Sequence, residues 1–174
     1  TDVAESLWSY PYIKELYDAG VVSGTSATTF SPAANVTRAQ FVTMLAGLAG
    51  ADVSNCPATP FRDVPEGAWY APYVNWALAN GIVSGTSAVT FSPDASITRQ
   101  DMAVMLYSYT QRFQVHLQQQ PVTPFTDAGS IAAYAQIAVQ TLQRAGVISG
   151  MPDGSFQPYG TATREQACTM LCML

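Results

Sequence analysis

Charge is the scarcest property of this 174-residue sequence, because charged side chains make up only 11% of it. Lysine and arginine together number 7 against 12 acidic residues, which gives a formal net charge of −5 at pH 7. Nucleic-acid binding depends on a broad basic surface. We therefore expect no nucleic-acid partner and a surface made mostly of uncharged polar residues.

Cysteine and histidine are also scarce. The three cysteines are Cys56, Cys168 and Cys172, and the one histidine is His116. Their odd number and their spacing do not form a disulfide framework. Cys168 and Cys172 lie one helical turn apart, as a metal pair would, but no neighbouring ligand completes a site, so buried free thiols are expected. Without a Gly-rich phosphate loop or a nucleophile–base pair, the sequence predicts no enzyme, no metal and no cofactor.

Long apolar runs are missing as well. No run approaches the ~20 residues of a membrane span, so membrane insertion is not expected. The chain begins with Thr1 and shows no signal peptide, and we expect it to be a fragment of a longer protein. Its hydrophobic content of 48% nevertheless favours a packed globular structure over disorder.

One pattern occurs three times in the chain. A Gly-apolar-apolar-Ser-Gly turn is followed by Thr-Arg-x-x, and 18 residues separate the first glycine from the arginine in every copy: Gly20 and Arg38, Gly81 and Arg99, Gly146 and Arg164. Such a period indicates a repeat protein. We place the repeats at residues 1–51, 61–111 and 125–174, with linkers at 52–60 and 112–124. A unit of this size buries too little surface alone, so the three should share one core.

Each repeat is predicted to contain two helices. The first helices cover about 10–19, 71–80 and 132–145, and each ends at a glycine in the C′ position, namely Gly20, Gly81 and Gly146. A loop with a shared Phe-x-Pro follows, in which Phe30, Phe91 and Phe156 should anchor the loop in the core.

The second helix begins at the Thr of each Thr-Arg motif. Its apolar residues recur at i, i+3, i+4 and i+7, which predicts one apolar stripe per helix. The stripes are Phe41, Met44, Leu45 and Leu48; Met102, Met105, Leu106 and Tyr109; and Ala167, Met170, Leu171 and Leu174. Three equivalent stripes can close on one another to form a shared bundle.

The fourth position of each Thr-Arg-x-x motif is Gln40, Asp101 or Gln166. Thr37, Thr98 and Thr163 should therefore cap their helices in capping boxes, with a weaker match at the shorter Asp101. The aspartates Asp2, Asp63 and Asp127, which open the repeats, are also interpreted as helix caps.

Capping does not explain Arg38, Arg99 and Arg164. An arginine at the first helical position meets the positive end of the helix dipole, at a cost of about 0.3–1 kcal/mol. Two interpretations are open. The arginine could pair with an aspartate of a neighbouring repeat, such as Asp2, Asp63 or Asp127. Alternatively, the guanidinium and the free N–H groups of the helix start could bind a carboxylate or phosphate.

Further residues recur in register with these arginines. The turns end in Ser23-Gly24, Ser84-Gly85 and Ser149-Gly150, which could contact a ligand or could serve turn geometry alone. An aromatic residue precedes each capping glycine by 12 positions: Trp8, Trp69 and Tyr134. These aromatics could stack on a sugar, although core packing is the interpretation we favour.

The aspartate-led start, the Ser-Gly turn, the Phe-x-Pro loop and the Thr-Arg helix start together resemble the repeat of the S-layer homology domain family, across nearly the whole chain. The third repeat also carries the Gly150-Met-Pro-Asp-Gly-Ser-Phe156 loop typical of that family. The resemblance implies a mainly α fold, in which three tandem helix-loop-helix repeats form a pseudo-threefold spindle around a central three-helix bundle, with grooves between neighbouring repeats.

The resemblance also implies a function. Such domains anchor secreted bacterial surface proteins non-covalently to the cell wall, usually through a secondary cell-wall polysaccharide that carries pyruvylated N-acetylmannosamine, and in some lineages through peptidoglycan. The three arginines would then pair with the ketal carboxylate, and the Ser-Gly turns and aromatics would line the grooves. The location would be extracellular, at the cell wall, and the role non-enzymatic. The oligomeric state is open.

Some residues depart from the family pattern. The motif glutamate is replaced by Gln40, Asp101 and Gln166, and repeat three has Tyr134 in place of tryptophan. Repeat one lacks the leading phenylalanine at the cut N-terminus. An alternative function is therefore a structural or interaction module of the cell surface whose glycan sites are degenerate.

Overall fold

The structure is a computed structural model that describes residues 2–174; Thr1, the first residue of the predicted repeat one, lies outside them. Each repeat contributes two α-helices. The first helices are α1 (Tyr10–Asp18), α3 (Ala71–Ala79) and α5 (Gln136–Arg144), and the second helices are α2 (Arg38–Leu48), α4 (Arg99–Arg112) and α6 (Arg164–Cys172). Within residues 2–174, no helix is both long enough and apolar enough to span a bilayer.

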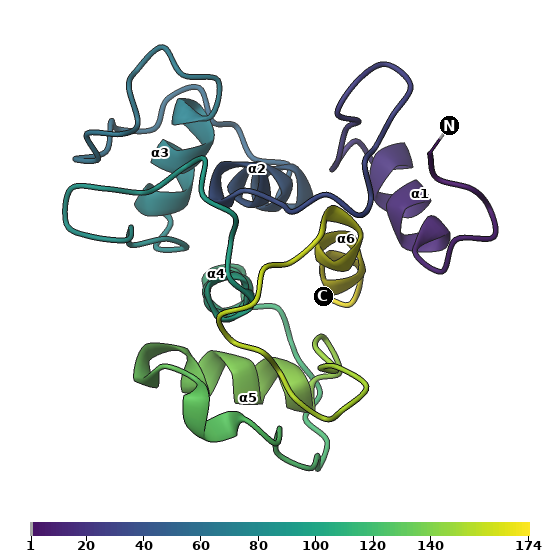
Figure 1. Cartoon of the computed structure of the whole chain (residues 1–174). Coiled ribbons are helices and arrows are strands. Elements are labelled where there is room, and N and C mark those ends of the chain that lie inside the picture. The colour runs from purple at the N-terminus through teal and green to yellow at the C-terminus, as the bar shows by residue number, and fades with distance from the viewer. Residues whose placement is uncertain (1) are drawn as a thin grey trace.

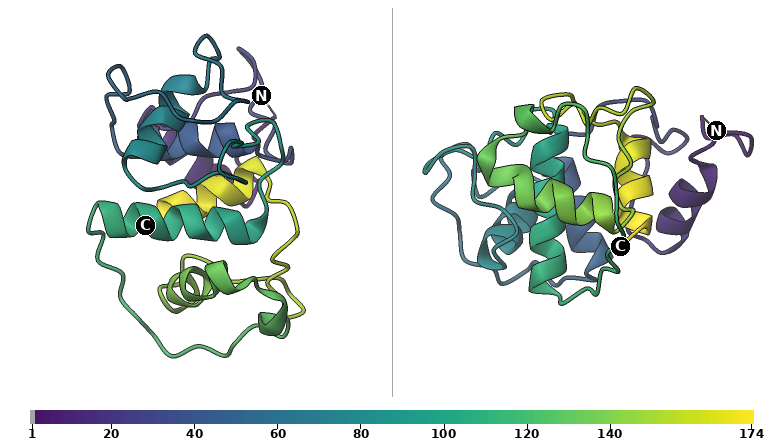
Figure 2. Two further views of the ribbon diagram at one scale, coloured as in Figure 1. Left: turned by 90° about the vertical axis from the view of Figure 1, so that its left-hand side faces the viewer. Right: turned by 90° about the horizontal axis from the view of Figure 1, so that it is seen from below.

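The second helices form the centre of the molecule. Figure 1 shows α2, α4 and α6 gathered around an approximate threefold axis, with α1, α3 and α5 outside them. In the right-hand view of Figure 2 the three inner helices run roughly side by side, and α5 crosses α4. Each inner helix packs mainly against the first helix of the next repeat: α2 against α3, α4 against α5, and α6 against α1. The predicted mainly α fold of three tandem helix-loop-helix repeats is therefore confirmed, and the packing of each inner helix on the next repeat shows that the repeats are interlocked.

The helix ends follow the local sequence. Thr37, Thr98 and Thr163 cap the inner helices, and full capping boxes form with Gln40 and Gln166 but not with Asp101. At the end of α1, Gly20 adopts φ +72°, and Val21 N–H donates to Leu16 O at 2.8 Å in a Schellman arrangement. Gly81 after α3 and Gly146 after α5 also have positive φ values, and the residue that follows each glycine donates the equivalent hydrogen bond.

One predicted boundary is wrong. The helix expected from Ala132 begins at Gln136, because the preceding residues form two short 3-10 helices, η1 (Ala128–Ser130) and η2 (Ala133–Ala135). In the first two repeats, Pro11 and Pro72 occupy the first turn of the helix. Repeat three has no proline there, and it enters the helix through the tighter η2 turn.

A single apolar core takes residues from all three repeats. The loop phenylalanines Phe30, Phe91 and Phe156 are buried, as predicted. Val36, Ile97 and Ala162 are fully buried just before the inner helices begin. Isolated bridges join the three chain segments there: Asn35 with Thr163, Thr37 with Ser96, and Thr98 with Thr161. The starts of the three inner helices are therefore held together at one end of the bundle.

Candidate ligand-binding grooves between the repeats

The three motif arginines have a structural role and are also candidate ligand-binding residues. Each is 4–5% exposed. Each Nε donates to a loop phenylalanine oxygen in the next repeat at 2.7–2.8 Å, and each guanidinium lies 4.4–5.1 Å from the centre of that phenylalanine ring. The pairs are Arg38 with Phe91, Arg99 with Phe156, and Arg164 with Phe30. The Phe-x-Pro loop of each repeat thus binds the start of the inner helix of the neighbouring repeat.

The backbone donors at the helix starts are not free. In α2, Arg38 N–H donates to Ala95 O at 2.9 Å and Ala39 N–H donates to Pro93 O at 3.0 Å, both in the loop of repeat two. The starts of α4 and α6 are bonded in the same way by the next repeat. The expectation of a backbone anion site is therefore wrong, and the side-chain guanidinium is the remaining cationic group.

The repeat-opening aspartates hold loops rather than helices or arginines. Both carboxylate oxygens of Asp63 accept backbone N–H groups, from Phe91 at 2.8 Å and Ser92 at 2.7 Å. Asp2 and Asp127 do the same in their repeats. The residue after each loop phenylalanine has a positive φ of 56–58°, so the aspartate stabilises a strained turn. The helix-cap interpretation of these aspartates is therefore wrong. An ion pair between a motif arginine and an aspartate of a neighbouring repeat does form at Arg38 among the described residues, but its partner is Asp101 and not Asp2, Asp63 or Asp127.

The in-register aromatics lie at the surface. Trp8, Trp69 and Tyr134 are 55%, 57% and 63% exposed. The favoured expectation that they pack in the core is therefore wrong. Exposed large aromatic side chains that recur in register are available for contact with a ligand.

The first cleft that joins these features is the α4 groove, a cavity of about 500 Å³ lined by Arg38, residues 81–86, Asp101, Val104, Met105, Ser108 and Tyr134. Its walls come from all three repeats. Arg38 Nη1 donates to Asp101 Oδ2 at 3.0 Å, and Tyr134 Oη donates to Asp101 Oδ1 at 2.6 Å. Burial and the bond to Asp101 raise the pKa of Tyr134 to about 12, while burial lowers the pKa of Arg38 against the opposing effect of Asp101.

The second cleft is the α2 groove, of about 190 Å³, lined by residues 21–25, Gln40, Thr43, Met44, Trp69 and Arg164. Its lining residues are equivalent to those of the α4 groove, shifted by one repeat. Here Arg164 Nη2 donates to the backbone oxygen of Ser23 at 2.8 Å. Gln40 occupies the position of Asp101, and its side-chain oxygen accepts from Thr37 N–H. The structure thus brings together an arginine, a Ser-Gly turn and an aromatic residue of the predicted site residues in each of these two grooves.

The third set consists of Arg99, Ser149, Gly150 and Trp8, and the internal repeat predicts its groove along α6. Among the described residues, the hydrogen bonding of the Arg99 side chain is confined to Nε, which bonds Phe156. Gln166 turns back to Thr163 N–H at 3.1 Å, as Gln40 does to Thr37. This set remains a prediction.

The turn glycines have a packing role. A Cβ at Gly85 would lie 2.6 Å from the ring of Phe61, and one at Gly150 would lie 2.5 Å from the ring of Phe125. Both glycines also have positive φ values, +85° and +77°. Structure alone therefore accounts for these glycines.

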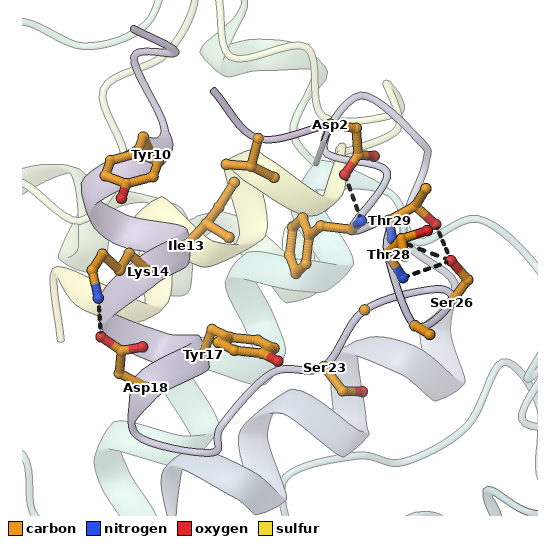
Figure 3. A pocket seen from close by; sticks show the side chains of 14 residues that line it. Asp2, Tyr10, Ile13, Lys14, Tyr17, Asp18, Ser23, Ser26, Thr28 and Thr29 are labelled. Carbon is orange, nitrogen blue, oxygen red and sulfur yellow. Dashed lines mark hydrogen bonds and ion pairs between the residues drawn. The ribbon is translucent and has the colours of Figure 1, made fainter. Parts of the chain in front are cut away.

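A further cavity, of about 570 Å³, lies inside repeat one rather than between repeats (Figure 3). Tyr10, Tyr17 and the 23–30 loop line it, and Lys14 pairs with Asp18 at its edge. In repeats two and three, a leading phenylalanine stacks on the loop phenylalanine in the corresponding place: Phe61 on Phe91, and Phe125 on Phe156. The equivalent position of repeat one would precede Thr1. This cavity is not part of the groove series.

Sequence reasoning missed the importance of Asp101. It was considered only as a helix cap, yet it binds groove residues from two other repeats. The available signal was its position: it is an acid where the other two motifs carry glutamine.

The cysteines behave as structural residues. Cys168 is fully buried, and Cys56 and Cys172 are half-buried; all three are free thiols. Burial raises the pKa of Cys168 to about 12 and that of Cys172 to about 11. Across residues 2–174, His, Cys, Asp and Glu side chains do not gather in groups of three or more that could hold a metal ion.

Comparison with known proteins agrees with this architecture. The family model described as the S-layer homology domain matches residues 1–42, 60–103 and 124–168. An endoglucanase of Bacillus sp. (strain KSM-635) is 39% identical over 177 residues, which cover all of this chain and 18% of that protein. The cellulosome-anchoring protein of Acetivibrio thermocellus is 28% identical over 88% of this chain and 35% of its own length. The S-layer protein sap of Bacillus anthracis is 26% identical over 98% of this chain and 20% of its length.

This chain therefore corresponds to only part of each of these longer relatives. The family and its surface-layer relatives place the chain outside the cell, at the cell wall. Three matched units in register, folded as three interlocked helix pairs, show that the chain belongs to the S-layer homology domain family.

Proposed function

We propose that this chain anchors a secreted bacterial surface protein to the cell wall by binding an anionic, pyruvylated secondary cell-wall polysaccharide in its inter-repeat grooves. One observation carries the proposal: a buried arginine and an exposed aromatic residue from another repeat line the same cleft. Arg164 and Trp69 form this pair in the α2 groove. The family and its anchoring relatives support a cell-surface anchoring role.

The chemistry of the α2 groove suits an acidic sugar. The terminal nitrogens of Arg164 can donate to a carboxylate, and a charge-assisted hydrogen bond contributes about 1.5–3 kcal/mol net. Trp69 offers an apolar face for stacking against the ring of the sugar. A single such site is weak, and two occupied grooves on one polymer gain affinity through effective concentration. Peptidoglycan is the second candidate partner.

The role we propose is non-catalytic. The endoglucanase relative shares only 18% of its length with this chain. Where a longer protein that contains this chain carries an enzyme, we place the catalytic groups outside residues 1–174. Hydrolysis of wall glycan by the isolated chain would contradict this.

The test is binding to purified cell-wall sacculi, with and without the accessory polysaccharide, and before and after removal of its pyruvate. Arginine substitutions would also damage the fold, so the exposed aromatics are the better probes. We expect Trp8→Ala together with Trp69→Ala to weaken binding by about tenfold or more, a factor that corresponds to about 1.4 kcal/mol. Tyr17→Ala, which removes an aromatic that is 60% exposed on α1, is the matched control. Equal binding to sacculi with and without pyruvate would refute the carboxylate role.

The second candidate is a structural or interaction module with degenerate glycan sites. The Arg38–Asp101 ion pair favours it, because it neutralises one of the candidate arginines. Unchanged retention of the Trp8→Ala and Trp69→Ala double variant on sacculi, in folded protein, would support this candidate over the first.

A further inference from the structure

The α4 and α2 grooves share one architecture but differ in charge. In the α4 groove, Asp101 contributes a carboxylate that is 25% exposed, directly against Arg38. In the α2 groove the same position is Gln40, a neutral side chain already bonded to Thr37 N–H. Because both grooves are built from equivalent segments, this one position sets their difference in charge.

Asp101 uses both of its oxygens within the groove. Oδ2 accepts from Arg38 Nη1 at 3.0 Å and Oδ1 accepts from Tyr134 Oη at 2.6 Å. Arg38 Nε is also engaged, with Phe91 O at 2.8 Å. A ligand carboxylate that approached Arg38 would therefore be repelled by the carboxylate of Asp101, which is hydrogen-bonded to Arg38.

The α2 groove has no carboxylate in the position of Asp101. Arg164 bonds only neutral backbone oxygens, those of Phe30 and Ser23. Its positive charge is balanced by no carboxylate within ion-pair distance among residues 2–174. An acidic substituent is accordingly favoured there.

The α4 groove offers a different set of groups. A carboxylate acceptor and a guanidinium donor lie side by side. Ser84, Thr86 and Ser108 also line the groove, and Tyr134 is exposed. Adjacent hydroxyls of a sugar both donate and accept, so they can bond to both members of an Arg–Asp pair. The cavity of about 500 Å³ has room for a sugar residue.

We infer that the α4 groove binds a neutral, polyhydroxylated sugar and rejects acidic ones, and that Asp101 is the residue that sets this specificity. The inference rests on the proposed function, which it deepens by assigning different sugars of one polymer to different grooves. An acidic sugar in the α2 groove and a neutral one in the α4 groove would together require a polymer that presents both.

The experiment is an NMR titration of the whole chain with two probes, methyl N-acetylmannosaminide and the same glycoside carrying a pyruvyl ketal. Ring signals of Tyr134 report on the α4 groove, and the Trp69 indole reports on the α2 groove. We expect the neutral glycoside to shift Tyr134, and the ketal glycoside to shift Trp69 and leave Tyr134 unmoved. Ketal binding at Tyr134 with a Kd within about twofold of that at Trp69 would overturn the inference.

Two reciprocal variants sharpen the result. Asp101→Gln, which copies the other two motifs, should let the α4 groove bind the ketal glycoside at least about tenfold more tightly. Gln40→Asp should weaken ketal binding at Trp69 by a similar factor. Retention of the wild-type amide spectrum elsewhere checks that each variant is folded. If a folded Asp101→Gln variant gains no ketal affinity, Asp101 does not set the specificity.

Failure of the proposed function gives a different outcome. If the ketal glycoside moves neither Trp8 nor Trp69 in the wild-type chain, the anionic-glycan function is refuted. The neutral-sugar assignment is then decided by the other probe: a shift of Tyr134 supports it, and no shift overturns it.

Discussion

At the residue scale, the motif arginines show that a residue proposed to bind a ligand can also have a structural role. Arg99 places its Nε on Phe156 O at 2.7 Å and its guanidinium 5.1 Å from the centre of that ring. The partner belongs to a different repeat, so each such contact joins two units. A helix dipole disfavours a cation at this position, and these inter-repeat contacts offset that cost.

We predict that Arg99→Ala lowers the free energy of unfolding by about 2–4 kcal/mol, because it leaves a buried carbonyl unpaired and removes the stacked cation. Arg99→Lys should recover little of this loss, since lysine cannot place a donor at the Nε position while stacking on the ring. Chemical denaturation of the wild type and both variants measures the effect. A change below about 0.5 kcal/mol in Arg99→Ala, the range of ordinary surface substitutions, would contradict a structural role.

Asp153 gives a prediction that depends on pH. Its Oδ1 accepts from the hydroxyl of Ser155 at 2.6 Å and from its N–H at 2.9 Å, and these bonds lower the pKa of Asp153 below the usual 3.8. A lowered pKa in the folded state adds stability above the unfolded-state pKa, and that stability is lost as the pH falls through the folded-state value. Asp153→Asn should therefore be less stable than the wild type near neutral pH, and the gap should close below about pH 4.

Unfolding by denaturant across this pH range makes the measurement. Ser155→Ala serves as the control, because it removes the hydroxyl donor and should reduce the same pH-dependent gap. A gap between wild type and Asp153→Asn that stays constant or widens as pH falls would count against the assignment.

At the element scale, local sequence was enough to locate most helices. Thr37, Thr98 and Thr163 start the inner helices where the capping pattern predicts. Gly20, Gly81 and Gly146 follow the ends of the first helices, α1, α3 and α5. These are short-range signals, and each depends on residues within one turn. The entry to α5 was misplaced because proline marks the first turn of α1 and α3 but is absent from repeat three.

Sequence could not reveal which loop meets which helix. Nothing near Arg38 indicates that Ala95 and Pro93 accept its helix N–H groups, because those partners lie in the next repeat. The pairing of Asp101 with Tyr134 was hidden for the same reason. Trp8 and Trp69 were assigned to the core from their type and register, although their exposure depends on how the repeats assemble. The fold was thus predictable from repetition, and the groove chemistry was not.

We predict that the capping threonine of α6 contributes measurably to stability. Thr163→Ala should lower the free energy of unfolding by about 1 kcal/mol, the usual value for a lost N-cap side chain. Thr169→Ala, in the same helix, is the matched control. The Thr169 hydroxyl donates to Glu165 O at 3.0 Å, a mid-helix bond that adds little to helix stability. Thermal or denaturant unfolding that ranks the two variants in the opposite order would contradict the capping argument.

At the scale of the whole molecule, the repeats are interlocked rather than strung in a row. Each inner helix packs on the first helix of the next repeat, and α6 of repeat three returns to α1 of repeat one. The Phe-x-Pro loop of repeat one also contacts repeat three, since Phe30 O accepts from Arg164 Nε. A closed ring gives every repeat two neighbours, unlike an open solenoid with free ends. The α2 and α4 grooves exist only in this closed form, because each is lined by residues of all three repeats.

Closure leads to our last prediction, that residues 1–123 alone lose cooperative folding. Without repeat three, α4 lacks its α5 partner, α1 lacks α6, and the start of α4 lacks the carbonyls of Pro158 and Gly160. Circular dichroism should show a broad, non-cooperative thermal transition in place of the sharp one expected for the whole chain. Addition of a 124–174 fragment should restore dispersed NMR signals and the sharp transition, because it supplies the missing helix pair. A sharp, native-like transition for 1–123 alone would mean that the ring does not need to close.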